Sequence, residues 1–108
     1  MAKVDEKWLR MNGWKKTVDE TEVIDTWKTY TTKSRHIVYE YRPQNHVYAR
    51  IDRTTLVSRF NDDNSIRERR LYYMFSAFNE KTGFRVENRI CHHRYNDNQI
   101  KAAIEVVS

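Results

Sequence analysis

Two histidines and a nearby carboxylate are the residues whose types would support catalysis. A chain reversal predicted at 43–45 would make His36 and His46 near neighbours across the turn. By alternation, Glu40 and Arg50 share the faces of these histidines. A base, an acid and a guanidinium that binds phosphate are what metal-free RNA cleavage requires. Because the spacing is generic, cross-strand surface histidines are the simpler interpretation, and a small ribonuclease is the least favoured of three functional hypotheses.

A second group, Cys91, His92 and His93, contains residue types that bind metals. Adjacent side chains on a strand point to opposite faces, so three consecutive residues do not converge on one ion. The chain has one cysteine and no further spaced set of ligands. Gly13 and Gly83 are too far apart to form a phosphate-binding loop. The sequence therefore predicts no metal site, no cofactor and no internal disulfide.

Arginine and aromatic residues are interleaved along the predicted strands. A sheet that presents rings and guanidinium groups can stack bases and neutralise phosphates. The same residue types form hot spots in protein interfaces, and they also pack against one another on ordinary solvated sheets. The candidate residues for binding nucleic acid or a partner protein are Tyr48, Arg50, Arg69, Arg70, Tyr73, Phe75, Arg85 and Arg89.

A β-hairpin predicted over residues 71–91 must position most of these candidates. The turn formers between its strands end in Gly83, which can adopt the left-handed conformation of a type I turn with a bulge. We expect Phe78 to lie opposite Phe84 or Val86, and both registers keep odd-numbered residues together on one face. The even face is the more apolar, so we assign it to the core. The odd face, with its rings and arginines, is then expected to face solvent.

A helix is the alternative for residues 65–78. Ser65 to Glu68 match a capping box, and several later apolar residues suit one face of a helix. The turn before Gly83 and the alternation after it favour the strand.

The remaining strands are predicted over 23–31, 36–42 and 46–52. At Arg53 the apolar pattern slips by one position, which indicates either a bulge or the start of a new strand. Residues 61–65 are consecutive turn formers and predict a loop.

Helices are predicted near both ends of the chain. A short one over 4–12 would end at Asn12-Gly13. Asn96 and Gln99 can form a capping box before a C-terminal helix with apolar residues at i, i+3, i+4 and i+7. The expected fold class is α+β. It comprises an antiparallel meander of about five to six strands, a short N-terminal helix, and a C-terminal helix packed on one face.

Composition narrows the class of partner. The 108 residues suggest a single domain, 1–108, with a net charge of +5 and a pI near 9.4. Arginine suits bidentate contact with phosphate or carboxylate, so an anionic partner is expected. The sequence lacks an N-terminal apolar signal and a run long enough to span a bilayer, so we expect a cytoplasmic protein, of a cell or an infected host, with no membrane partner.

These observations lead to two principal hypotheses. The first is a non-enzymatic module that binds nucleic acid, RNA or single strands in preference to duplex, because no long basic helix is predicted for a major groove. The alternative is a protein-interaction or inhibitor module for an acidic partner surface, with a homodimer through the odd face as one form of it. The composition is typical of an accessory protein from a virus or a mobile element.

Overall fold

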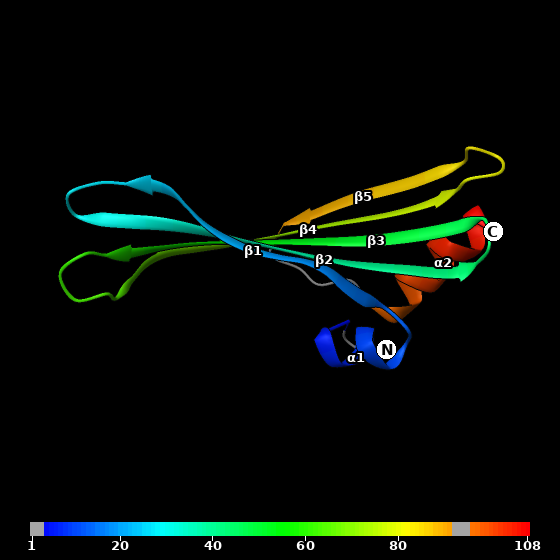
Figure 1. The fold of residues 1–108 in the computed structure, drawn as a ribbon, viewed down its shortest axis with the longest axis horizontal. Coiled ribbons are helices and arrows are strands. Elements are labelled where there is room, and N and C mark those ends of the chain that lie inside the picture. Colours follow the sequence, from blue (N-terminus) through cyan, green and yellow to red (C-terminus); the bar gives the residue numbers. More distant parts are fainter. Residues whose placement is uncertain (1–3, 92–95) are drawn as a thin grey trace.

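The computed structural model describes residues 4–91 and 96–108, and the side chains outside 88–95. It confirms the α+β class: one open sheet of five antiparallel strands in the order β1-β2-β3-β4-β5, with a helix near each end of the chain (Figure 1). Each strand pairs with its neighbours in sequence. The elements are α1 (Glu6–Met11), β1 (Lys15–Thr26), β2 (Tyr30–Gln44), β3 (Val47–Phe60), β4 (Ile66–Asn79), β5 (Arg85–Cys91) and α2 (Asp97–Val107).

Both predicted helices form, and α1 is shorter than the predicted range of 4–12. The Asp5 side chain accepts a hydrogen bond from the Trp8 amide at the start of α1, and Gly13 follows the helix with φ +85°. At α2 the capping box of Asn96 and Gln99 is complete in both directions. None of the helices within 4–91 and 96–108 is long and apolar enough to cross a bilayer.

The strands are longer than predicted, and several boundaries differ. The segment 23–31 is not one strand, because the chain turns at 27–29 between β1 and β2. The reversal predicted at 43–45 lies at Asn45 and His46 instead, and Pro43 belongs to β2. The loop at 61–65 is confirmed, and residues 66–79 form strand β4 rather than a helix.

The bulge or new strand predicted at Arg53 is wrong. Strands β2 and β3 pair without interruption from Tyr30 opposite Phe60 to Tyr41 opposite Ala49, so β3 passes Arg53 with its alternation intact. The apolar pattern changes there because the covering of the sheet changes. Up to Ile51 the odd-numbered residues of β3 lie beneath the helices, and beyond Arg53 no described helix covers that face.

The hairpin between β4 and β5 forms, but neither predicted register is correct. Phe78 lies opposite Arg85, because four residues separate Asn79 from Phe84 in the turn. Gly83 has the predicted left-handed conformation, with φ +77°. Even-numbered residues of β4 therefore share a face with odd-numbered residues of β5, so the two strands never form the expected odd face.

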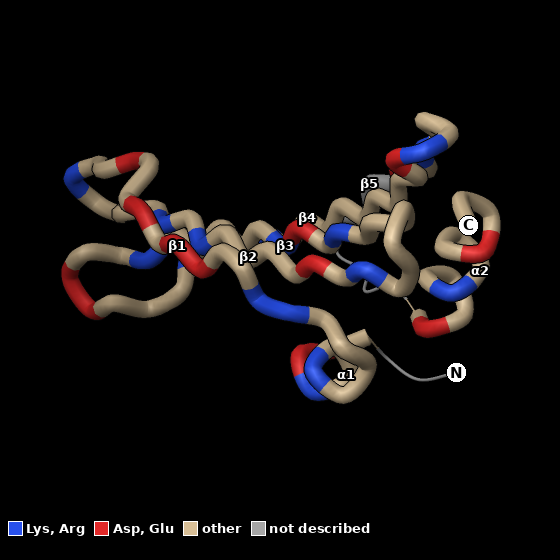
Figure 2. Tube along the Cα trace, turned by 45° about the vertical axis from the view of Figure 1, so that its right-hand side comes forward, with Lys and Arg blue, Asp and Glu red and all other residues tan. Residues whose placement is uncertain are grey.

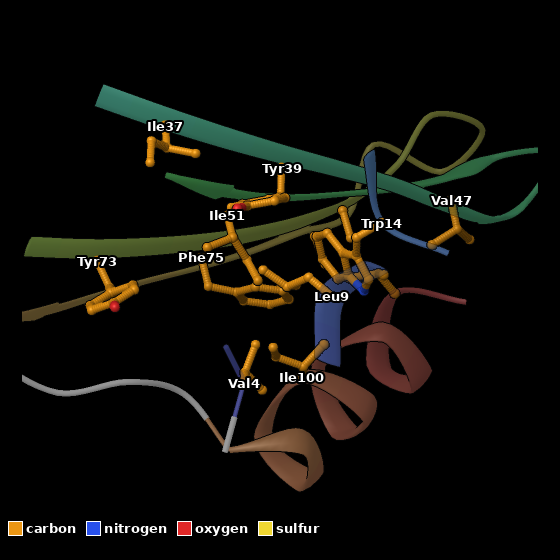
Figure 3. Close-up of a cluster of buried hydrophobic side chains, with 13 residues drawn as sticks. Val4, Leu9, Trp14, Ile37, Tyr39, Val47, Ile51, Tyr73, Phe75 and Ile100 are labelled. Atoms are coloured by element: carbon orange, nitrogen blue, oxygen red, sulfur yellow. The ribbon is translucent and has the colours of Figure 1, made fainter. Parts of the chain in front are cut away.

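The assignment of the core to the even face of β4 is also wrong. Tyr73, Phe75 and Ala77 point into the hydrophobic core, and Phe75 is only 2% exposed. The core lies between the sheet and the two helices, where Leu9 of α1 and Ile100 of α2 approach these rings (Figure 3). Both helices pack on this face of the sheet, and the rings of Tyr73 and Phe75 are buried beneath them.

About half of the sheet extends beyond the helices. We call residues 19–36 and 53–71 the arm and the helix-covered remainder the body; the arm ends in the two free hairpin tips of Figure 1. The molecule measures 52 × 28 × 20 Å, and its radius of gyration of 16.4 Å exceeds the roughly 13 Å typical of a compact chain of this length. Within the arm, Ser58 is the one buried residue, so strand pairing rather than a core holds this half together.

Candidate nucleic-acid interface

The sheet has two faces with different charge. We call the face that packs on α1 and α2 the helix-side face, and the opposite one the open face. Figure 2 shows acidic positions along β1 and both signs of charge at the hairpin tips. Because neighbouring residues on a strand point to opposite faces, the distribution of charge depends on side-chain direction rather than on which strand carries it.

On the open face, arginines bind carboxylates of the protein itself. Arg70 Nε donates to Glu68 Oε1 at 2.7 Å, and Arg85 Nη1 lies 4.0 Å from Glu87 Oε2. These charges are satisfied internally, which lowers the attraction of this face for an external anion.

Among the described residues, Asp52 is the buried charged group of the open face, and it is 8% exposed. Arg50 donates to both of its oxygens, at 2.8 and 2.9 Å, and His36 Nε2 lies 2.8 Å from Oδ1. Burial alone would raise the pKa of Asp52, but the hydrogen bonds from Arg50 and His36 outweigh it and hold that pKa below its usual range. The carboxylate in turn raises the pKa of Arg50, so Arg50 is committed to a structural ion pair.

The histidines predicted as a catalytic pair are far apart. His36 lies opposite Thr54 in the arm, whereas His46 is in the turn between β2 and β3 at the other end of the molecule. Ten residues of extended strand separate them, or about 33 Å. Glu40 shares a face with His36, as predicted from parity, and lies opposite Arg50, but it is four residues from His36 along β2. The expected constellation for RNA cleavage is therefore not assembled.

Four cations that form no ion pair with a described carboxylate lie on the helix-side face of the arm. We call Lys33, Arg53, Arg59 and Arg69 the cationic face. Lys33 and Arg69 lie in one row across the sheet, on either side of Val57. Within the described part of the chain, Lys33 and Arg69 form no hydrogen bond or ion pair. Arg59 uses one N–H for the carbonyl of Asn64, at 2.9 Å.

Arg53 marks the base of the cationic face, next to α1. It is half-buried and lines a small cavity together with Asp5 and Glu6, yet its Nε has no hydrogen-bond partner among the described residues. Six residues of strand separate Arg53 from Arg59, so the cationic face extends for roughly 20 Å along β3. Its width from Lys33 to Arg69 is two strand spacings, or about 10 Å.

One further cation borders this face but is neutralised. Arg35 Nε and Nη2 donate to the two oxygens of Asp19, at 2.9 and 2.8 Å. These hydrogen bonds lower the pKa of Asp19 to about 2. The pair separates the acidic edge strand β1 from the free cations of β2, β3 and β4.

The predicted binding residues do not lie together on one face of the sheet. Tyr48, Arg50, Arg70 and Arg85 lie on the open face, and only Arg69 lies on the cationic face. Tyr73 and Phe75 are core residues, so their rings cannot stack on a partner. The side chain of Arg89 and the group His92-His93 lie outside the described residues, as does the side chain of Cys91. In the part that is described, no three His, Cys, Asp or Glu side chains gather as metal ligands do.

Lys33 and Arg53 were missed as candidates. Both are odd-numbered, like Arg59 and Arg69, and this shared parity is the signal that the sequence contains. Shared parity identifies a common face only when two facts are known. Strand β3 must run through Arg53 without a break, and odd-numbered residues of neighbouring strands must lie opposite one another.

Comparisons with protein-family models, curated proteins and solved structures found no match, so the geometry of the chain itself is the basis for inferring function.

Proposed function

We propose that this protein binds nucleic acid, RNA or single strands in preference to duplex, through the cationic face. The observation that supports this proposal is the asymmetry of the arm: Arg67 and Arg70 of the open face pair with Glu68, whereas Lys33 and Arg69 on the opposite face pair with no described carboxylate. Unpaired cations gathered on one surface repel one another, and an anionic partner relieves this repulsion.

The dimensions of the cationic face suit a short stretch of a phosphate backbone. At about 3.4 Å per nucleotide along one stacked strand, 20 Å corresponds to roughly six phosphates. Neither described helix is placed to enter a major groove, because α1 and α2 both pack against the body. A flexible single strand can follow the twist of the sheet, which supports a preference for single strands.

The test is the salt dependence of oligonucleotide binding. Three to four phosphate contacts predict that log K falls with log salt with a slope of roughly −2 to −3 for a single strand. Arg69→Ala should weaken binding to all sequences and reduce the slope by about 0.7. Arg70→Ala is the matched control, because this neighbouring arginine points to the open face and binds Glu68.

Two results would overturn the proposal. One is a flat response to salt, or no binding at low salt. The other is an Arg70→Ala protein that loses as much affinity as Arg69→Ala, because the contacts would then not depend on the cationic face.

A second candidate function, docking of a partner protein, is favoured by one specific observation. Five large apolar residues of the arm are exposed: Val23, Ile24, Trp27, Phe60 and Ile66. Exposed apolar groups concentrated in one region are typical of protein interfaces. A partner protein should remain bound after nuclease treatment of a pull-down, whereas proteins bridged by nucleic acid should be lost.

A further inference from the structure

We infer that the open face of the arm is a self-association surface, on which a second copy of this chain packs face to face. This inference goes beyond the proposed function and does not depend on it, because the open face is opposite to the cationic face. Three features of the open face support it: accessible aromatic rings, a buried hydroxyl without a partner, and charges of opposite sign on the two outer strands of the arm.

Aromatic rings gather on the open face near the free end of the arm. Tyr30 lies opposite Phe60 on strands β2 and β3, and the ring of Trp27 lies 6.2 Å from that of Tyr30. Phe60 is 38% exposed and Trp27 is 57% exposed, and Leu56 on the same face is half-buried. Accessible rings beside charged residues are typical of protein interfaces.

A buried hydroxyl close to these rings lacks a partner. Ser58 is 3% exposed, and its Oγ forms no hydrogen bond with any described residue. It lines a cleft of about 320 Å³ together with Tyr30, Thr32 and Leu56. Because buried polar atoms are normally hydrogen-bonded, this hydroxyl needs a further group at the cleft. A second copy that closes the cleft can supply this group, either directly or by enclosing a water.

The two outer strands of the arm carry opposite charge on the open face. On β1, Glu20 and Glu22 are exposed and form no ion pair with a described residue. On β4, Arg67 and Arg70 share one carboxylate, that of Glu68, so this strand keeps a net positive charge. A surface that is acidic along one side and basic along the other is complementary to a second copy of itself.

This complementarity defines the symmetry of the pair. A two-fold axis parallel to the strands, between β2 and β3, lays β1 of each copy over β4 of the other. One row across the sheet consists of Glu22, Ser34, Leu56 and Arg70. The axis therefore brings Glu22 to Arg70 of the second copy, and the large Leu56 to its small Ser34. Packed sheets lie about 10 Å apart, a gap that a glutamate and an arginine span together.

Other two-fold arrangements bring like charges together. A two-fold axis that crosses the strands lays β1 over β1 of the second copy. A continuous sheet formed by two β1 edges would place Asp19, Glu20 and Glu22 beside the same strand of the second copy. Like charges opposed at an interface disfavour association. The charges therefore select the pair in which β1 faces β4.

The area of the surface predicts a weak dimer. Eight residues of strand at about 3.3 Å and four strands at about 4.8 Å give roughly 500 Å² per copy. Together the two copies would bury about 1,000 Å², which is the lower limit for a specific interface. We therefore expect a concentration-dependent equilibrium, in which the cationic faces of both copies stay exposed on the outside.

The experiment measures the mass of the full chain by sedimentation from about 1 to 500 µM, without nucleic acid. The mass of the parent should rise from 13.2 kDa towards twice this value. Glu22→Arg and Arg70→Glu should each weaken the dimer about tenfold or more, because each opposes like charges across the pair. An equimolar mixture of the two variants should recover the affinity of the parent, since the reversed charges then face one another.

Matched controls reverse charges on α2, on the other side of the sheet. Glu105→Arg and Lys101→Glu change the net charge by the same amounts and should dimerise as the parent does. Circular dichroism should show all four variants folded, since each changed residue is exposed to solvent.

Three results would overturn the inference. A parent that stays at 13.2 kDa throughout would show that no second copy covers the open face. Dimerisation that neither Glu22→Arg nor Arg70→Glu weakens would place the interface elsewhere. A mixture of the two folded variants that fails to recover the dimer would refute the pairing of β1 with β4. The salt dependence of oligonucleotide binding tests the cationic face separately.

Discussion

Strands β1 to β4 run through both halves of the molecule, but different interactions stabilise the two halves. In the body, one face of the sheet packs on two helices, and rings such as Phe75 and Trp14 are almost fully buried. In the arm, both faces meet solvent, and the stabilising interactions are the strand pairing and the hydrogen bonds of Asn61 between the hairpin tips. The same strands therefore contribute to a core in one half and to a surface in the other.

This difference shows why unpaired cations are found in the arm. An unpaired arginine beneath the helices would have to lose its hydration, at a cost of several kcal/mol. Beyond Arg53 the same face of β3 is open to water, so Arg59 and its neighbours remain hydrated. The end of the helix layer thus decides where the helix-side face can carry charge.

The largest expected effect on stability is in the body. Phe75→Ala should lower the free energy of unfolding by about 3–5 kcal/mol, because it leaves a cavity beneath the helices. Val57→Ala, at a half-buried position of the arm, should cost less than about 1 kcal/mol. Chemical denaturation of both variants measures the contrast. Equal losses would show that the arm has a core of its own.

An intermediate effect is expected at Asp52, where the open face passes from body to arm. Asp52→Ala should cost about 2 kcal/mol near neutral pH, because it removes charged hydrogen bonds to Arg50 and His36. The folded state lowers the pKa of this carboxyl, so its contribution is present above the unfolded value of about 4 and is lost as the pH falls below it.

The measurement is the difference in unfolding free energy between the parent and Asp52→Ala at pH 7 and at pH 3. The difference should shrink at the lower pH. A difference that is constant or larger at pH 3 would mean that the hydrogen bonds do not depend on the charge of Asp52.

The smallest effect is expected at the tips of the arm. Asn61→Ala should cost about 1 kcal/mol and should increase hydrogen exchange at residues 27–31, because it removes the side-chain bonds between the two hairpins. Asn45→Ala is the control, in the turn between β2 and β3 at the opposite end. Exchange that increases equally in both variants would show that the tips are not joined through Asn61.

Local signals in the sequence were sufficient to predict the helices and most strands, but not which face of a strand is buried. Asn96 and Gln99 predicted the start of α2 correctly, since a capping box involves only neighbouring residues. The faces of β4 depend on which side the helices cover, and both sides of this strand contain aromatic residues. Tyr73 and Phe75 were therefore assigned to solvent, although they are core residues.

The candidate site was predicted only in part, for the same reason. Arg69 lies on the exposed helix-side face of the arm. Arg85 was grouped with it through an incorrect register of the β4–β5 hairpin, and Tyr73 through the wrong assignment of the core. One residue more or fewer in the turn before Gly83 reverses the parity of β5 relative to β4. The faces of a hairpin follow from the geometry of its turn, which composition alone does not determine.

No described helix covers the part of the arm beyond Arg53, and this has a consequence for how such a molecule can vary. Residues can be added to or removed from both strands of both hairpins together, in steps of two, while the pairing of β2 with β3 and the bonds of Asn61 between the tips are kept. The body places no restriction on such changes, since its helices stop at Arg53. The length of the arm, and with it the length of the proposed cationic face, can therefore change while the core of the body stays the same.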